Sequence, residues 1–184
     1  MGVFRTGLNF GRGSIFSISA TFRNPMVVGA VSDKPWTVVV AARTGDVDDA
    51  DNLGRLQVSM QSLPVQPLSQ NINRVELRVQ EGPNIGQTTR IGEARKIIDG
   101  LVHDEIFGSP NPFTITLIVD RASGRGGAIL TTKTQTVELE FEQALFSDDN
   151  GDPLTVAGAV LVNQGAGRSA SVEVTHFEIW DNTP

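Results

Sequence analysis

The chain has 184 residues, a formal net charge of −6 and no cysteine. This length is enough for a sizeable hydrophobic core, and we expect a single domain over residues 1–184. The lack of cysteine excludes thiol catalysis, cysteine-ligated zinc and disulfide cross-links. The acidic balance argues against a nucleic-acid partner, because phosphate binding requires a basic face and the arginines and lysines are scattered along the chain.

The first 16 residues do not read as a secretory signal, because Arg5, Arg12 and several glycines interrupt the apolar stretch that such a signal needs. The longest apolar run lies near residues 36–42 and is far shorter than the ~20 residues that cross a bilayer. We therefore expect no signal peptide and no membrane partner. The sequence does not determine the location, for which the virion surface and the cytoplasm are the candidates.

Short segments in which polar and apolar residues alternate recur along the chain, separated by residues that favour turns. A period of two, rich in β-branched residues, is typical of half-buried antiparallel strands. In chain order this pattern predicts about ten strands, over residues 14–22, 26–31, 36–42, 55–63, 74–80, 113–120, 127–132, 136–142, 154–162 and 171–180. Strict alternation in the last segment predicts one face with Val172, Val174, His176, Glu178 and Trp180, and the other with Glu173, Thr175, Phe177 and Ile179.

Only one segment favours a helix. Residues 93–99 begin with good helix formers, and Gly100 could end a helix of one or two turns there. Residues 120–127 are rich in glycine and predict a hairpin loop. Ten strands with at most one short helix predict an all-β fold, a two-sheet antiparallel β-sandwich or jelly roll in which each sheet buries its apolar face.

Four segments of the second half occur in a distinctive order. Residues 112–120 form a strand pattern that leads through Ala122-Ser123-Gly124 into the strand pattern of residues 127–130, and residues 152–158 and 172–181 follow. This order resembles the concanavalin-A-like lectin and glucanase superfamily, including the laminin-G-like domains; the first half resembles it only in its rhythm of strands. The resemblance implies a jelly roll and a role among lectins, adhesion modules, β-glucanases, alginate lyases or viral and phage structural proteins.

Three glutamates form the candidate catalytic row. Glu138, Glu140 and Glu142 share one face of the expected strand, because alternate residues of a strand point the same way. The row resembles that of the laminarinase and lichenase β-glucanases, which implies Glu138 as nucleophile, Glu142 as general acid and Glu140 as the assisting residue. Glu140 replaces the Asp of that motif and adds a methylene where the carboxyl groups must stand about 5–5.5 Å apart. We therefore favour a solvated row of glutamates and assign no catalytic residue.

Trp36, Trp180 and Arg125 are the candidate ligand-binding residues. Sugar clefts commonly stack sugar rings on Trp and Tyr, but the chain has no Tyr and an aromatic content of 6%. Arg125 lies in a glycine-rich loop that is no phosphate loop, because no helix pattern follows it, and its guanidinium could contact a partner.

A calcium site is the one metal site considered. Asp148, Asn150 and Asp152 occupy alternating positions like those that begin a Ca²⁺ loop, but no glutamate follows at the required distance. We favour an ordinary solvated loop and expect no cofactor, with Ca²⁺ as the alternative. The only histidines are His103 and His176, and neither has metal-ligand spacing.

These observations favour a non-catalytic recognition or assembly module over an enzyme. An assembly protein, such as a capsid-decorating or fibre component of a virus or phage, fits a cysteine-free sandwich and is preferred. A glycan-binding, lectin-like module is the first alternative, and a β-glucanase that uses Glu138 and Glu142 is the second. We expect protein partners or self-association, with a glycan as the alternative partner.

Overall fold

The computed structural model describes residues 2–28, 37–43, 55–62, 74–82, 92–99, 111–142, 154–162 and 169–182. Within these ranges the chain forms strands and no helix, and so no helix that could span a membrane. The strands are β1 (Gly2–Arg5), β2 (Ile15–Val28), β3 (Thr37–Arg43), β4 (Arg55–Ser62), β5 (Arg74–Gly82), β6 (Gly92–Asp99), β7 (Phe113–Asp120), β8 (Arg125–Thr131), β9 (Thr136–Phe141), β10 (Val156–Val162) and β11 (Ser169–Asp181).

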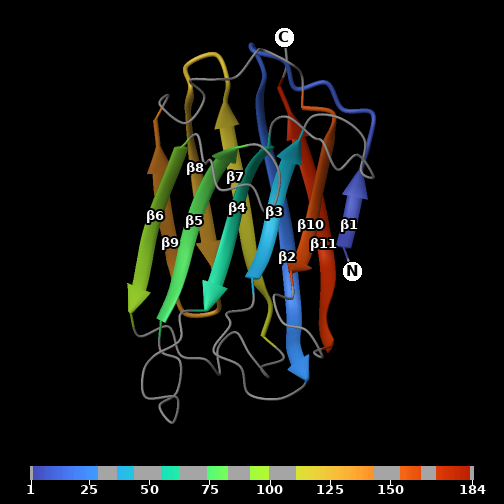
Figure 1. Ribbon diagram of the computed structural model, residues 1–184, viewed down its shortest axis with the longest axis vertical. Helices are drawn as coiled ribbons and strands as arrows, with labels where there is room; N and C mark the ends of the chain where they lie inside the picture. The colour runs from blue at the N-terminus through green and yellow to red at the C-terminus, as the bar shows by residue number, and fades with distance from the viewer. Residues whose placement is uncertain are drawn as a thin grey trace.

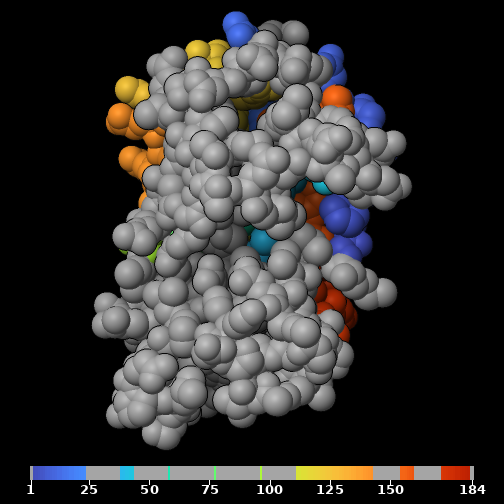
Figure 2. Space-filling view, viewed as in Figure 1, coloured from blue at the N-terminus to red at the C-terminus, as the bar shows by residue number. Residues whose placement is uncertain are grey.

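Two antiparallel sheets pack face to face (Figure 1). The six-stranded sheet has the order β1-β10-β3-β4-β5-β6, and the five-stranded sheet has the order β11-β2-β7-β8-β9. Among the described strands, β1 therefore lies at one edge of the first sheet, and the blue atoms of the N-terminal residues are visible at the surface in Figure 2. This architecture confirms the predicted two-sheet β-sandwich.

The hydrophobic core lies between the sheets and follows directly from alternation along the strands. In β7, Phe113 and Leu117 are buried, whereas Thr114 and Thr116 are half-buried on the opposite face. The same alternation buries Val38, Val40 and Ala42 of β3 in the other sheet. Removing apolar surface from water contributes about 25 cal/mol per Å², so these inward rows drive the pairing of the sheets.

The predicted helix over residues 93–99 is wrong, because this segment is the strand β6. Helix propensity is a weak preference, and here the tertiary pairing decides: β6 is hydrogen-bonded along its length to β5. The edge of the sandwich adds a further contact, since Lys96 Nζ donates a hydrogen bond to the Glu138 carbonyl oxygen at 3.1 Å. β6 is thereby attached to β9 of the other sheet.

The predicted break between residues 22 and 26 is also wrong, because β2 continues through it. The register between β2 and β11 shifts at this point, so that Asn24 and Pro25 lie opposite Val172 alone. Two residues that face one form a β-bulge. Proline has no N–H to donate and is tolerated in strands at bulges, so β2 continues through Pro25.

Candidate functional site

The predicted row of glutamates lies on β9, an edge strand of the five-stranded sheet among the described strands. Glu138 and Glu140 are exposed, whereas Val137 and Phe141 on either side of them are buried and Leu139 between them is partly buried. Glu142 is also exposed and follows the end of β9. The glutamates therefore stand on the surface of the sandwich that faces away from the core.

Trp180 lies on the same outer surface but at the opposite edge. The register places Trp180, Ser17, Ile118, Gly127 and Glu140 in one row across the five strands. Neighbouring strands are about 4.8 Å apart, so Trp180 and Glu140 are separated by about 19 Å. The structure therefore does not bring the tryptophan and the glutamates together. Trp36 and the predicted calcium ligands Asp148, Asn150 and Asp152 lie outside the described residues, as does His103.

The faces of β11 differ from those that strict alternation predicts. Between Val174 and His176 the register with β2 shifts, so Thr175 is an extra residue in β11. This bulge reverses the order of inward and outward residues: Val174 and Phe177 both pack against the core, and Thr175 and His176 are both exposed. The assignment of Val172 and Val174 to the face of Trp180 was therefore wrong, as was the assignment of Phe177 and Ile179 to the face of Glu173 and Thr175.

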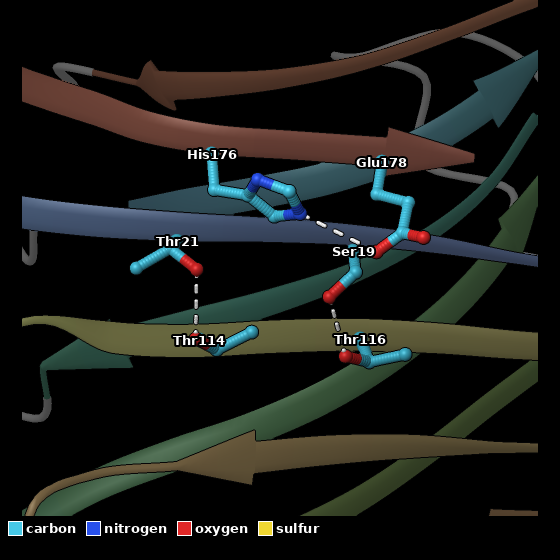
Figure 3. A network of polar contacts seen from close by, with 6 residues as sticks. All are labelled: Ser19, Thr21, Thr114, Thr116, His176 and Glu178. Carbon is cyan, nitrogen blue, oxygen red and sulfur yellow. Dashed lines mark hydrogen bonds and ion pairs between the residues drawn. The ribbon is translucent and has the colours of Figure 1, made fainter.

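Two pairs of hydroxyl groups join β2 to β7 on the outer surface (Figure 3). Ser19 Oγ lies 2.8 Å from Thr116 Oγ1, and Thr21 Oγ1 lies 2.9 Å from Thr114 Oγ1. Each pair is a hydrogen bond between directly opposite residues of neighbouring strands, which fixes the rotamers of both side chains. The pairs are partly buried and form a hydroxyl-lined strip along the middle of the sheet.

β11 flanks this strip with ring and carboxylate groups. His176 Nε2 lies 3.3 Å from Glu178 Oε2, and both side chains are exposed beside the hydroxyl pairs (Figure 3). One row further along, Trp180 is 51% exposed and Ile118 is 38% exposed, on either side of Ser17. We call this outer surface of β11, β2 and β7 the hydroxyl face; its members are Ser17, Ser19, Thr21, Thr114, Thr116, Ile118, His176, Glu178 and Trp180.

The sequence contains part of the signal for the hydroxyl face. Ser17, Ser19 and Thr21 alternate in one predicted strand, and Thr114 and Thr116 alternate in another. Alternation shows that each set shares a face, but only the register between strands shows that the two sets meet.

Arg125 lies at the hairpin between β7 and β8. The Asp120 carboxylate accepts hydrogen bonds from the Ser123 hydroxyl at 2.7 Å and from the Ser123 and Ala122 backbone N–H groups at 3.1 and 3.0 Å. The Ser123 hydroxyl and these N–H groups hold the pKa of Asp120 below its ordinary value. Gly124 completes the turn with φ of 70°, and Arg125 follows as an exposed residue opposite Asp120. The hairpin loop is thus well fixed and presents the Arg125 side chain to solvent.

Metal ligands do not gather in the part of the chain that the structure describes. No group of three or more His, Asp or Glu side chains there is placed to hold a metal ion. His176 and Glu178 form a pair, which is too few ligands for a typical protein metal site.

No known protein family matches the chain by sequence, and no curated protein matches it. Its structure is similar to a glycoside hydrolase family 16 endo-glucanase from Bacteroides ovatus (TM-score 0.55, 11% identity, 97% of this chain and 74% of that chain). It is also similar to scytalido-glutamic peptidase (TM-score 0.54, 17% identity, 97% and 78%) and to a legume lectin-like domain from Entamoeba histolytica (TM-score 0.54, 8% identity, 97% and 89%). At such identities the likeness concerns the fold alone. The protein therefore has the concanavalin-A-like jelly-roll fold.

Proposed function

We propose that the protein is a recognition module that binds a glycan without cleaving it, through the hydroxyl face. The observation that carries this proposal is Trp180, half-exposed at the edge of a surface lined with serine and threonine hydroxyls. An exposed aromatic ring gives a sugar ring an apolar face to stack on, and adjacent polar groups fix its orientation.

The hydroxyl pairs are suited to contact a polar ligand. In a pair such as Ser19–Thr116, one O–H donates to the other oxygen, which leaves one O–H donor and several lone pairs for a ligand. Because the pairing already fixes both side chains, a ligand that binds there has little side-chain freedom left to remove. The half-exposed Ile118 extends the apolar contact around Trp180.

The exposure of the glutamate row supports a non-catalytic role. A retaining glycosidase needs a carboxylic acid whose pKa is raised by an apolar or crowded surrounding, close to a second carboxylate. Glu138 and Glu140 stand exposed on an edge strand, about 19 Å from Trp180 across the sheet. The glycosidic bond of a sugar stacked on the Trp180 indole would therefore not lie between the carboxyl groups of Glu138 and Glu140.

Trp180→Ala is expected to weaken glycan binding about tenfold, because stacking on an indole contributes on the order of 1 kcal/mol and often more. We would titrate a panel of soluble oligosaccharides, neutral and amine-bearing, by isothermal titration calorimetry. Phe4→Ala is the matched control: Phe4 is also about half exposed (48%) but lies on β1 of the other sheet, so its loss should leave affinity unchanged.

Three results would contradict the proposal. The first is binding that Trp180→Ala and Phe4→Ala affect equally, and the second is no binding by any member of the panel. The third is hydrolysis of a β-glucan that Glu138→Gln abolishes, which would make the glutamate row an active site.

An assembly role is the second candidate, and one observation favours it. β1 is an edge strand among those described, and its Val3 and Phe4 are 39% and 48% exposed. An edge strand with exposed apolar residues can pair with a strand of another chain. A capsid-decorating or fibre protein would be one form of such an assembly and stays a prediction.

Val3→Lys is expected to convert an oligomer into a monomer, because a lysine on an edge strand opposes pairing with a second edge. Light scattering coupled to size exclusion would measure the mass of both proteins. Thr6→Lys adds the same charge just beyond β1 and should leave the oligomer intact. A wild-type protein that is monomeric at all concentrations would exclude self-assembly through β1.

A further inference from the structure

We propose that the glycan bound by the hydroxyl face carries amines: a cationic polymer or oligomer of amino sugars. This inference rests on the proposed function and adds the charge of the ligand. The evidence is the distribution of charged residues over the whole outer surface of the five-stranded sheet. The hydroxyl face is one part of that surface.

Two neighbouring rows of residues cross this surface from edge to edge. One row comprises Trp180, Ser17, Ile118, Gly127 and Glu140. The other comprises Glu178, Ser19, Thr116, Ile129 and Glu138. Each row ends in a carboxylate on β9, and the second also begins with one on β11.

Along these two rows, the surface is therefore acidic at both edges of the sheet and uncharged between the edges. The two rows contain three glutamates and neither lysine nor arginine. Outside these rows, two bases lie opposite acids in the register, Arg23 opposite Glu173 and Arg125 opposite Asp120.

Two other basic groups stand close to these carboxylates. His176 pairs with Glu178 at 3.3 Å, and Lys96 reaches the Glu138 carbonyl oxygen from β6. Lys96 lies beside Glu138, so the excess of negative charge is clearest at Glu140 on one edge and at Glu178 on the other.

Charge and shape together select the ligand. A single exposed carboxylate attracts an ammonium group weakly, but a ligand with amines along its length can meet both edges at once, and the contributions combine. At the Trp180 edge an ammonium group can also lie against the indole face, which favours cations. A neutral glycan would gain only the stacking and hydrogen bonds, and an anionic glycan would be repelled.

The test compares glucosamine oligomers with N-acetylglucosamine oligomers of the same length, at a pH at which the amines are protonated. We expect the glucosamine oligomers to bind about tenfold more tightly at low ionic strength, and the preference to decline with added salt. The double variant Glu140→Gln, Glu178→Gln should lose the preference and keep the binding of the acetylated oligomers, whereas Trp180→Ala should weaken both. Both glutamates are exposed, so the double variant should fold.

Arg5→Gln is the control for net charge. Arg5 is exposed on β1 of the other sheet, and its loss makes the whole protein more acidic. If the preference is local, Arg5→Gln leaves it unchanged; if it reflects only net charge, Arg5→Gln strengthens it, which overturns the proposal.

The outcomes separate this inference from the proposed function. Equal binding of both oligomers, reduced by Trp180→Ala, would overturn the cationic ligand and leave glycan recognition standing. If neither oligomer binds but another glycan binds through Trp180, the cationic ligand is also overturned and glycan recognition stands. An oligolysine peptide that binds as tightly as the glucosamine oligomers, whether or not Trp180 is present, would show general attraction of cations and overturn the inference.

Discussion

Gly126→Ala is expected to destabilise the protein by about 3 kcal/mol or more, at or above the upper end of what overpacking usually costs. A Cβ on Gly126 would lie 2.3 Å from the Ile118 carbonyl oxygen and 2.3 Å from Cζ of Phe141. The ring of Phe141 could turn away only by leaving the core, where it is 4% exposed, and the carbonyl oxygen belongs to the β7 backbone. The substitution therefore forces β8 away from β7.

Gly127→Ala is the matched control, one residue further along β8. There a Cβ would meet only the Leu139 carbonyl oxygen at 3.6 Å, an ordinary contact. Unfolding in guanidinium, followed by circular dichroism, should give Gly127→Ala a stability within about 1 kcal/mol of wild type, since glycine in a strand is itself unfavourable by that order. Equal stability of the two variants would show that β8 can move without loss of the core.

Phe10→Ala is expected to cost about 3–5 kcal/mol, the usual range for a buried phenylalanine. Phe10 is fully buried, and its ring stacks on Phe16 with a centroid separation of 4.0 Å. Its backbone exchanges two hydrogen bonds of 3.1 Å with Leu154, and Arg121 Nη1 donates to its carbonyl oxygen. Phe10 thus joins the residues before β10 to β2 and to the β7–β8 hairpin.

Thermal or denaturant unfolding of Phe10→Ala should be compared with that of Phe4→Ala. Phe4 is about half exposed, so its truncation removes less apolar burial and should cost about 1 kcal/mol or less. If Phe10→Ala were no more costly than Phe4→Ala, the segment before β2 would not be part of the stabilising core.

Several strands occur within one or two residues of their predicted bounds. β5 and β7 are two of them, and each alternates polar and apolar residues over most of its length, the exceptions being Gln80 and Glu81 in β5 and Ile118 in β7. β6 was missed because Glu, Ala, Arg and Lys favour a helix locally, and only pairing with β5 overrides that preference. β1 was missed because four residues are too few to show a period.

The candidate site was less accessible to sequence analysis. The exposure of Glu138 and Glu140 followed from their alternation with buried residues of β9. The pairing of Ser19 with Thr116 could not be predicted from alternation, because these residues are separated by 97 positions and meet only through the register of β2 with β7. The bulge at Thr175 also left no signal that alternation could use, so half of β11 was assigned to the wrong face.

Alternation is a property of neighbouring residues, and for that reason the chain alone revealed an all-β sandwich and the inward rows of most strands. The order of strands, their register and the positions of bulges depend on contacts between distant segments, whose free energies are small individually and decided by the packing of the whole core. The hydroxyl face consists of such contacts: Trp180 on β11, Ser17 on β2 and Ile118 on β7 became neighbours only when the sheet formed.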